Sequence, residues 1–188
     1  MSRPTLHIII ASTRPGRVGP AIAAWFEGVA KEQGSFDVAV IDLKEFNLPI
    51  YNEPGHPMTG VYAFDDTKKW SASVTRADAF VFVMPEYNHS FNAALKNAID
   101  FLHREWNYKP VAFVSYGGIS AGTRAVQSLK PTLTALSMFP LAEQVAIASH
   151  QQYLADGVFH AAAGLDDVAQ SMLGNLARWT SAMASLRE

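Results

Sequence analysis

The sequence predicts an α/β fold in which an open, five-stranded parallel sheet is covered by helices on both faces. Short apolar runs alternate with amphipathic segments along the whole chain. The runs are apolar at consecutive positions and rich in Ile, Val and Phe, which is typical of parallel strands buried on both faces. Right-handed crossovers then place the connecting helices on both sides of the sheet. The 188 residues show no repeat or linker-like shift in composition, so we expect one domain over residues 1–188.

Five strand–helix units account for this pattern. The predicted strands are residues 6–11, 38–41, 79–84, 111–114 and 145–148. The predicted helices lie around Ile22, Trp25, Phe26 and Val29, over residues 65–77, around Leu95, Ile99 and Leu102, over residues 121–137, and around Leu165, Val168, Met172, Leu176, Trp179 and Met183. Pro131 is expected to kink or divide the fourth helix, because proline removes a hydrogen bond from a helix interior. Ligands of such sheets bind beyond the carboxyl ends of the strands, which directs attention to the loops 12–19, 85–90 and 116–122.

Composition excludes several classes of protein. Hydrophobic residues make up 49% and charged residues 17% of the chain, as in ordinary globular domains. The formal net charge of -2 argues against a nucleic-acid partner. The absence of cysteine excludes disulfides and thiolate metal sites and favours a reducing cytoplasm. We expect no signal peptide, no membrane span, since no apolar stretch approaches ~20 residues, and no metal site, since the histidines lack ligand spacing.

The first loop, Ser12-Thr13-Arg14-Pro15-Gly16-Arg17-Val18-Gly19, has the composition of a phosphate site. Hydroxyls, guanidiniums and the N–H groups at a helix start all donate to phosphate oxygens, and the helix dipole favours negative charge. The candidate ligands are Ser12, Thr13, Arg14, Arg17, Val18 and Gly19. The loop has neither the G-x-G-x-x-G of dinucleotide sites nor the G-K-[ST] of triphosphate loops, so a terminal monophosphate such as that of FMN fits best. The alternative is that the hydroxyls cap the turn while the arginines are solvated.

A longer motif follows the third predicted strand. Residues 85–100 read P-E-Y-N-H-S-F-N-A-A-L-K-N-A-I-D. This segment resembles the P-E-Y-N-x-S-x-x-x-x-L-K-N-A-I-D signature of NAD(P)H-dependent FMN reductases, a family that also contains quinone, azo-dye and chromate reductases. The first loop resembles the S-x-R phosphate motif of the same family, and residues 115–118 resemble its third, glycine-containing flavin loop. Asn92 and Ala93 stand where many members have Pro and Gly; Asn92 can cap a helix, so we expect the helix to begin near there.

The resemblance implies a flavodoxin-like, three-layer sandwich with strand order 2-1-3-4-5. It also implies bound FMN, with NADPH or NADH as the electron donor. The implied flavin contacts are Pro85, Glu86, Tyr87 and Asn88 of the second loop and Ser115, Tyr116, Gly117 and Gly118 of the third. Tyr87 is expected near the flavin ring. Glu86 and Asn97 either hold the loop through hydrogen bonds to backbone or contact the ligand directly.

Two further residue assignments concern the neighbourhood of the expected flavin. Gly117 and Gly118 permit positive φ and close backbone approach, so one of their N–H groups is expected to meet the N1/C2=O edge of the flavin. His89 is expected to be solvated rather than to serve as an acid, because hydride transfer to a flavin needs no protein acid.

The function implied by the resemblance is an FMN-dependent NAD(P)H oxidoreductase that reduces a small acceptor, such as a flavin, quinone, azo compound or chromate, by ping-pong hydride transfer. No side chain is assigned as catalytic, since the flavin carries the chemistry. The alternatives are a flavodoxin-type electron carrier, against which the mild net charge argues, and a non-catalytic flavin-sensing protein. The family also implies a homodimer or homotetramer, and the apolar segment 42–65 is consistent with an interface.

Overall fold

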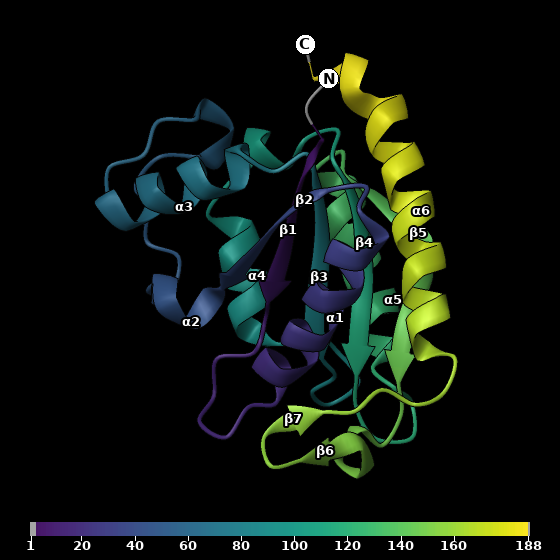
Figure 1. The fold of residues 1–188 in the computed structure, drawn as a ribbon. Helices are drawn as coiled ribbons and strands as arrows, with labels where there is room; N and C mark the ends of the chain where they lie inside the picture. The colour runs from purple at the N-terminus through teal and green to yellow at the C-terminus, as the bar shows by residue number, and fades with distance from the viewer. Residues whose placement is uncertain (1–2, 188) are drawn as a thin grey trace.

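Five parallel strands form one sheet through the centre of the molecule (Figure 1). The computed structural model describes residues 3–187, so the first two residues of the N-terminal segment lie outside the described residues. The strands are β1 (Thr5–Ile10), β2 (Asp37–Asp42), β3 (Ala79–Pro85), β4 (Pro110–Tyr116) and β5 (Phe139–Ile147). Their spatial order is β2-β1-β3-β4-β5, which confirms the predicted fold class and strand order.

Burial along the strands follows their place in the sheet. Every residue of the central strands β3 and β4 is buried, which explains why these strands are continuous apolar runs in the sequence. At the edge, β2 leaves Asp37 and Val40 exposed. The opposite edge strand, β5, begins six residues before the predicted start. Its early part mixes Pro140 and Glu143 with apolar residues, and only a strand with a partner on one side accommodates that mixture.

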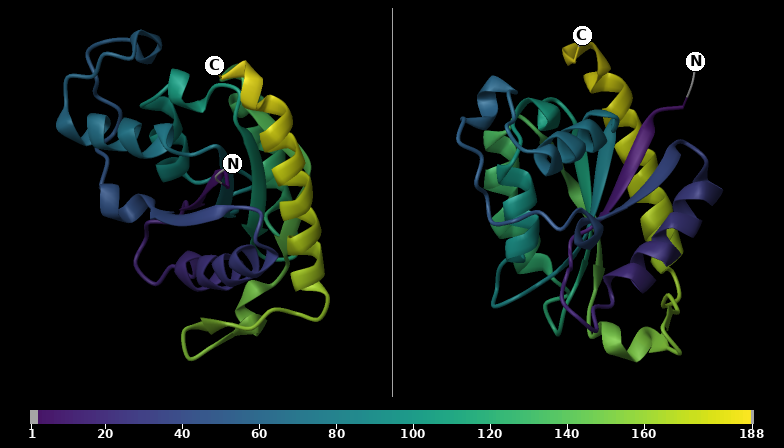
Figure 2. Two further views of the ribbon diagram at one scale, coloured as in Figure 1. Left: turned by 45° about the horizontal axis from the view of Figure 1, so that its top comes forward. Right: turned by 90° about the vertical axis from the view of Figure 1, so that its left-hand side faces the viewer.

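Two helical layers cover the sheet, as Figure 2 shows from the side. Helices α1 (Gly19–Gln33) and α6 (Leu165–Met183) share one core cluster with Leu6, Ile8 and Ile10 of β1. The other face carries α3 (Asp65–Thr75), α4 (Ala93–Asp100) and α5 (Thr123–Ala135), which pack with Ile9, Phe80 and Phe82. Because alternate residues of β1 enter opposite clusters, the sheet has an apolar layer on each side.

Pro131 does not divide α5. The helix is continuous across it, although it is shorter at both ends than the predicted 121–137. Pro131 is exposed, whereas Leu129 and Leu133 are both fully buried against the sheet. Packing of these two leucines compensates for the hydrogen bond that proline cannot donate.

Several short elements have no clear sequence pattern and were not predicted. They are the helix α2 (Leu43–Phe46), the 3-10 helices η1 (Pro57–Thr59), η2 (Arg104–Trp106), η3 (His150–Tyr153) and η4 (Ala184–Leu186), and the hairpin of β6 (Leu154–Ala155) and β7 (Val158–Phe159). The hairpin lies at the carboxyl end of the sheet, where the arrowheads of β4 and β5 point in Figure 1. Within residues 3–187, no helix combines the length and the hydropathy that crossing a membrane requires.

Candidate functional site

The three loops singled out from the sequence converge at the carboxyl edge of the sheet. They enclose a hollow of about 50 Å³. Its lining residues are Arg14, Arg17, Val18, Pro85, Glu86, Tyr87, Tyr116, Gly117 and His150. Eight of these nine belong to the predicted loops, and His150 does not. The remaining predicted residues do not line the hollow: Ser12, Thr13, Gly19, Asn88 and Gly118 lie in the same loops, and Ser115 lies at the end of β4.

The loop between β1 and α1 leaves its polar groups free. Within the described part of the chain, none of the backbone N–H groups of residues 12–18 donates to a protein acceptor. Ser12 Oγ and Tyr116 OH are buried without a partner, which is rare for buried hydroxyls. A Cβ at Gly19 would collide with Ser12 Oγ and lie 3.1 Å from Tyr116 OH. The helix start therefore forms a cradle of donors that suits an anion.

Burial also keeps the Tyr116 phenol in its donor form. Desolvation raises its pKa to about 12 and outweighs the lowering effects of the neighbouring Ser12 hydroxyl and of the Arg14 and Arg17 guanidiniums. At neutral pH Tyr116 therefore carries its proton.

The two arginines of this loop differ in their partners. Arg14 is exposed, and among residues 3–187 its guanidinium donates to Pro15 O alone, at 3.2 Å. Arg17 forms a bidentate ion pair with Asp42 at 2.5 Å and donates to Ser12 O at 2.6 Å. Burial alone would raise the pKa of Asp42, but the hydrogen bonds from Arg17 and from Lys44 N–H hold that pKa below its ordinary value. Arg17 thus shapes the loop, whereas the Arg14 guanidinium is available to a ligand.

This ion pair gives a pH-dependent prediction. Asp42→Asn is expected to lower the free energy of unfolding at pH 7 by about 1–2 kcal/mol, because both side chains are mostly shielded from solvent. A depressed carboxylate pKa stabilises the fold above the unfolded pKa, and this contribution is lost as the pH falls through the folded pKa. Urea unfolding at pH 7 and pH 3 should show the deficit shrinking at low pH.

Asp37 provides the matched control, since it begins the strand that Asp42 ends. Its ion pair with Arg3 is exposed on both sides, and such pairs contribute little. Asp37→Asn should therefore change stability much less than Asp42→Asn; equal losses would contradict the assignment.

Glu86 ties the second loop to the third. Its side chain is 6% exposed and accepts hydrogen bonds from Ser120 Oγ at 2.8 Å, Arg124 Nε at 2.6 Å and Arg124 N–H at 3.2 Å. Burial would raise its pKa, but the hydrogen bonds from Arg124 and Ser120 keep the pKa below its usual value. Of the two roles expected for Glu86, the structure shows the one that holds the loop.

Tyr87 opens a tight turn beside the hollow. Its N–H donates to Ser90 O at 2.9 Å, and Ser90 N–H returns to Tyr87 O at 3.0 Å. The two residues between them, Asn88 and His89, have φ of 49° and 67°, as in the two-residue turns that require left-handed backbone. The turn leaves the Tyr87 residue 37% exposed at the rim of the hollow.

His89 is exposed, as expected, but it is not simply solvated. Its Nε2 lies 2.8 Å from Arg124 Nη1, which can only donate, so Nε2 acts as the acceptor. The imidazole therefore belongs to the same polar network as Glu86.

Two asparagines hold backbone rather than ligand. Asn97 accepts from Tyr51 N–H at 2.8 Å and donates to Pro49 O at 2.6 Å. Asn92 precedes α4, whose start is where it was expected, but its side chain does not cap the helix. Instead its Nδ2 donates to Ala11 O at 2.7 Å. Asn92 therefore occupies the N-cap position, as expected, while its side-chain amide binds the end of β1 and makes no hydrogen bond to the first turn of the helix.

Neither Gly117 nor Gly118 adopts the positive φ that glycine permits, although the close backbone approach is present at Gly117. The left-handed glycine of this loop is Gly122, with φ of 79°. A Cβ there would lie 2.8 Å from Tyr116 N, and a Cβ at Gly117 would lie 3.0 Å from Gly122 N. Gly118, in contrast, has no heavy atom within 4 Å of its Cβ position. Backbone atoms lie too close to Gly117 and Gly122 to leave room for a Cβ, whereas the space beside Gly118 is open.

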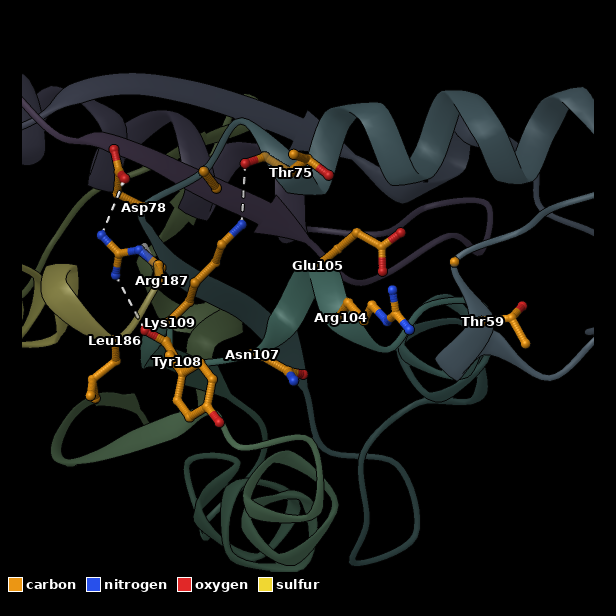
Figure 3. A pocket seen from close by; sticks show the side chains of 12 residues that line it. Thr59, Thr75, Asp78, Arg104, Glu105, Asn107, Tyr108, Lys109, Leu186 and Arg187 are labelled. Atoms are coloured by element: carbon orange, nitrogen blue, oxygen red, sulfur yellow. Dashed lines mark hydrogen bonds and ion pairs between the residues drawn. The ribbon is translucent and has the colours of Figure 1, made fainter.

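A larger hollow, of about 780 Å³, lies elsewhere (Figure 3). It opens at the amino ends of β3 and β4, opposite the edge where parallel sheets bind ligands. Two of its cationic groups are engaged with the protein. Lys109 Nζ donates to Val74 O and Thr75 O, and Arg187 pairs with Asp78 at 3.3 Å. The smaller hollow is therefore the candidate functional site.

Comparisons with known proteins agree with this architecture. The family model of NADPH-dependent FMN reductases matches residues 4–152. An NAD(P)H-dependent FMN reductase of Schizosaccharomyces pombe is 40% identical over 72% of this chain and 74% of its own. A quinone reductase of Pseudomonas putida is 36% identical over 71% and 72%.

Solved structures show the same fold. The flavoenzyme NAD(P)H:(acceptor) oxidoreductase FerB from Paracoccus denitrificans superimposes with a TM-score of 0.73 at 22% sequence identity. The superposition covers 95% of this chain and 97% of FerB. The family match over residues 4–152 and the relative at 40% identity show that the chain belongs to the NADPH-dependent FMN reductase family.

Proposed function

We propose that this protein is an FMN-dependent NAD(P)H oxidoreductase that reduces a small acceptor such as a quinone, a flavin or an azo compound. The observation that carries the proposal is the cradle at the start of α1, with its free N–H groups and two orphaned hydroxyls. It lies beside a hollow formed by the other two loops. Family membership and relatives named FMN reductase and quinone reductase support the same activity.

The residues present fit FMN. The phosphate would be held by Ser12, Thr13, Arg14 and the N–H groups of residues 12–18, while Arg17, Val18 and Gly19 would shape the loop around it. The isoalloxazine would lie between residues 85–88 and residues 115–118. Tyr87, half exposed at the rim, offers an aromatic surface to the ring.

When bound, FMN supplies the capacity to take a hydride from NADPH or NADH and to pass the electrons to an acceptor. The chain's own contribution is orientation and electrostatics. Arg14 and the free N–H groups would place positive potential at the phosphate, and the loop 115–118 would offer the Gly118 N–H to the flavin. Because one exposed ring face would serve both donor and acceptor, we expect ping-pong kinetics with parallel double-reciprocal lines.

Gly118→Val tests the proposal without disturbing the fold. Its Cβ position has no protein atom within 4 Å and its φ is not left-handed, so a branched side chain should meet only the ligand. We expect the dissociation constant of FMN to rise at least tenfold in fluorescence titration, with the urea midpoint unchanged. Gly174→Val, which also meets no protein atom within 4 Å, is the control and should bind FMN normally.

Turnover separates the enzyme from its alternatives. FMN-loaded protein should oxidise NADPH or NADH rapidly when a quinone is supplied. Bound FMN that neither nucleotide reduces would instead indicate an electron carrier or a flavin sensor. Failure of the wild-type chain to bind FMN would refute the site itself.

We further propose that the protein is a homodimer or homotetramer. Four large apolar residues of the segment between α2 and α3 are exposed: Ile50 by 89%, Met58 by 53%, Val61 by 74% and Phe64 by 45%. Clustered exposed apolar residues are typical of interfaces. Light scattering of the wild type should give two or four chain masses, and Ile50→Glu together with Val61→Glu should shift it toward one; a monomeric wild type would contradict the proposal.

A further inference from the structure

His150 reaches the hollow from outside the three predicted loops. It begins η3, which is separated from the end of β5 by two residues, and it is 9% exposed. Its Nδ1 lies 3.0 Å from Gly117 O, and its ring meets the Tyr116 ring edge-on with 5.2 Å between centroids. Two contacts therefore fix the imidazole against the loop that follows β4.

The contact with Gly117 determines which nitrogen carries the proton. A carbonyl oxygen only accepts hydrogen bonds, so Nδ1 of His150 is the donor. Nδ1 carries a hydrogen both in the neutral tautomer that makes this bond and in the imidazolium. His150 can therefore donate to the Gly117 carbonyl in either form of its imidazole.

The other polar backbone groups of Gly117 and Gly118 are engaged, with one exception. Gly117 N–H donates to Ile147 O at 3.2 Å, and Gly118 O accepts from Ala121 N–H at 3.1 Å and from Ser149 N–H at 3.0 Å. The exception is the N–H of Gly118, which donates to no protein acceptor within residues 3–187. It is the one free donor of this dipeptide.

The peptide bond between Gly117 and Gly118 is trans, so its C=O and N–H point in opposite directions in one plane. By holding the Gly117 carbonyl, His150 fixes the direction of the Gly118 N–H. We propose that His150 is a positioning residue that orients the Gly118 N–H toward the pyrimidine edge of bound FMN, where reduction accumulates negative charge. This inference rests on the proposed function, because it requires FMN in the hollow.

Three substitutions separate positioning from packing. His150→Leu removes the donor and keeps an apolar side chain in place. His150→Asn carries its amide N–H close to where Nδ1 lies, so it can still donate to Gly117 O. His150→Gln carries its amide N–H near the position of Nε2 instead. His160→Leu, at an exposed histidine outside the hollow, is the control.

The readouts are the FMN dissociation constant and the two-electron midpoint potential of the bound flavin. For His150→Leu we expect the affinity for reduced FMN to fall about tenfold more than that for oxidised FMN. This ratio corresponds to a potential about 30 mV more negative for a two-electron couple. His150→Gln should behave like His150→Leu, whereas His150→Asn and His160→Leu should stay near the wild type.

An unchanged potential in folded His150→Leu would overturn the inference, as would equal shifts in the Asn and Leu variants, which would indicate packing alone. If His150→Leu does not fold, the contrast between the Asn and Gln variants decides the question. A wild-type chain that fails to bind FMN would overturn the proposed function instead, so the two failures are distinguishable.

Discussion

Gly122→Ala is expected to lower the free energy of unfolding by about 3 kcal/mol. The left-handed φ of 79° alone costs a residue with a Cβ about 1 kcal/mol. Crowding adds to it, because the new Cβ would lie 2.8 Å from Tyr116 N and 3.0 Å from Tyr116 O. These are backbone atoms at the end of a buried central strand and have little room to shift, so about 2 kcal/mol of further strain is expected.

Gly164→Ala separates the two causes. Gly164 has almost the same φ, 81°, but its Cβ position meets no atom within 4 Å. Urea denaturation should therefore show a loss of only about 1 kcal/mol at position 164. Equal losses in the two variants would show that the close backbone contacts at Gly122 do not contribute to the loss of stability. FMN binding should weaken in the Gly122 variant alone, because the crowding falls on the loop that follows β4.

The second large effect is a loss of folding stability in acid, which we expect His7 to cause. The residue lies in β1, is 2% exposed, and its Nδ1 has no hydrogen-bond partner. Burial, reinforced by the positive charges of Arg76 and Lys109, lowers its pKa to about 4. The unfolded chain takes up a proton near pH 6.5 whereas the folded chain resists until about pH 4, so stability is complete above pH 6.5 and is lost as the pH falls toward 4.

His7→Leu should remove this sensitivity, because leucine cannot titrate. At 1.36 kcal/mol per pKa unit, the wild type should lose about 2 kcal/mol more than the variant between pH 7 and pH 5. Urea unfolding at the two pH values gives the comparison directly. His160→Leu, at an exposed histidine, should keep the wild-type slope. Parallel pH profiles of wild type and His7→Leu would show that His7 does not cause the loss.

The sheet could be predicted from the sequence because its inner strands are buried on both faces. Residues 79–84 and 111–114 are apolar at nearly every position and lie in β3 and β4. The edge strand β5 was predicted only at its end, since its first residues face both solvent and protein. Patterns of hydropathy thus identify strands well where both neighbours are present and less well at edges.

The sequence predicted which loops form the site but not the contacts between those loops and other segments. Arg17 was expected to meet a phosphate with Arg14, and nothing local indicates that Asp42 would engage it. The parallel register that places Ile10 beside Asp42 brings the carboxylate to the loop. His150 carries no local signal either, because its place beside Gly117 depends on the pairing of β4 with β5. Contacts between distant segments are set by tertiary structure, which a single sequence does not reveal.

The hollow is assembled from residues between 14 and 150, which lie at the ends of four strands: β1, β3, β4 and β5. No fragment shorter than residues 14–150 contains all of its walls, and such long-range pairings form slowly during folding. The hollow can therefore hold a ligand only after β5 has joined the sheet. A molecule that binds this hollow stabilises the complete fold by mass action and does not stabilise partly folded chains.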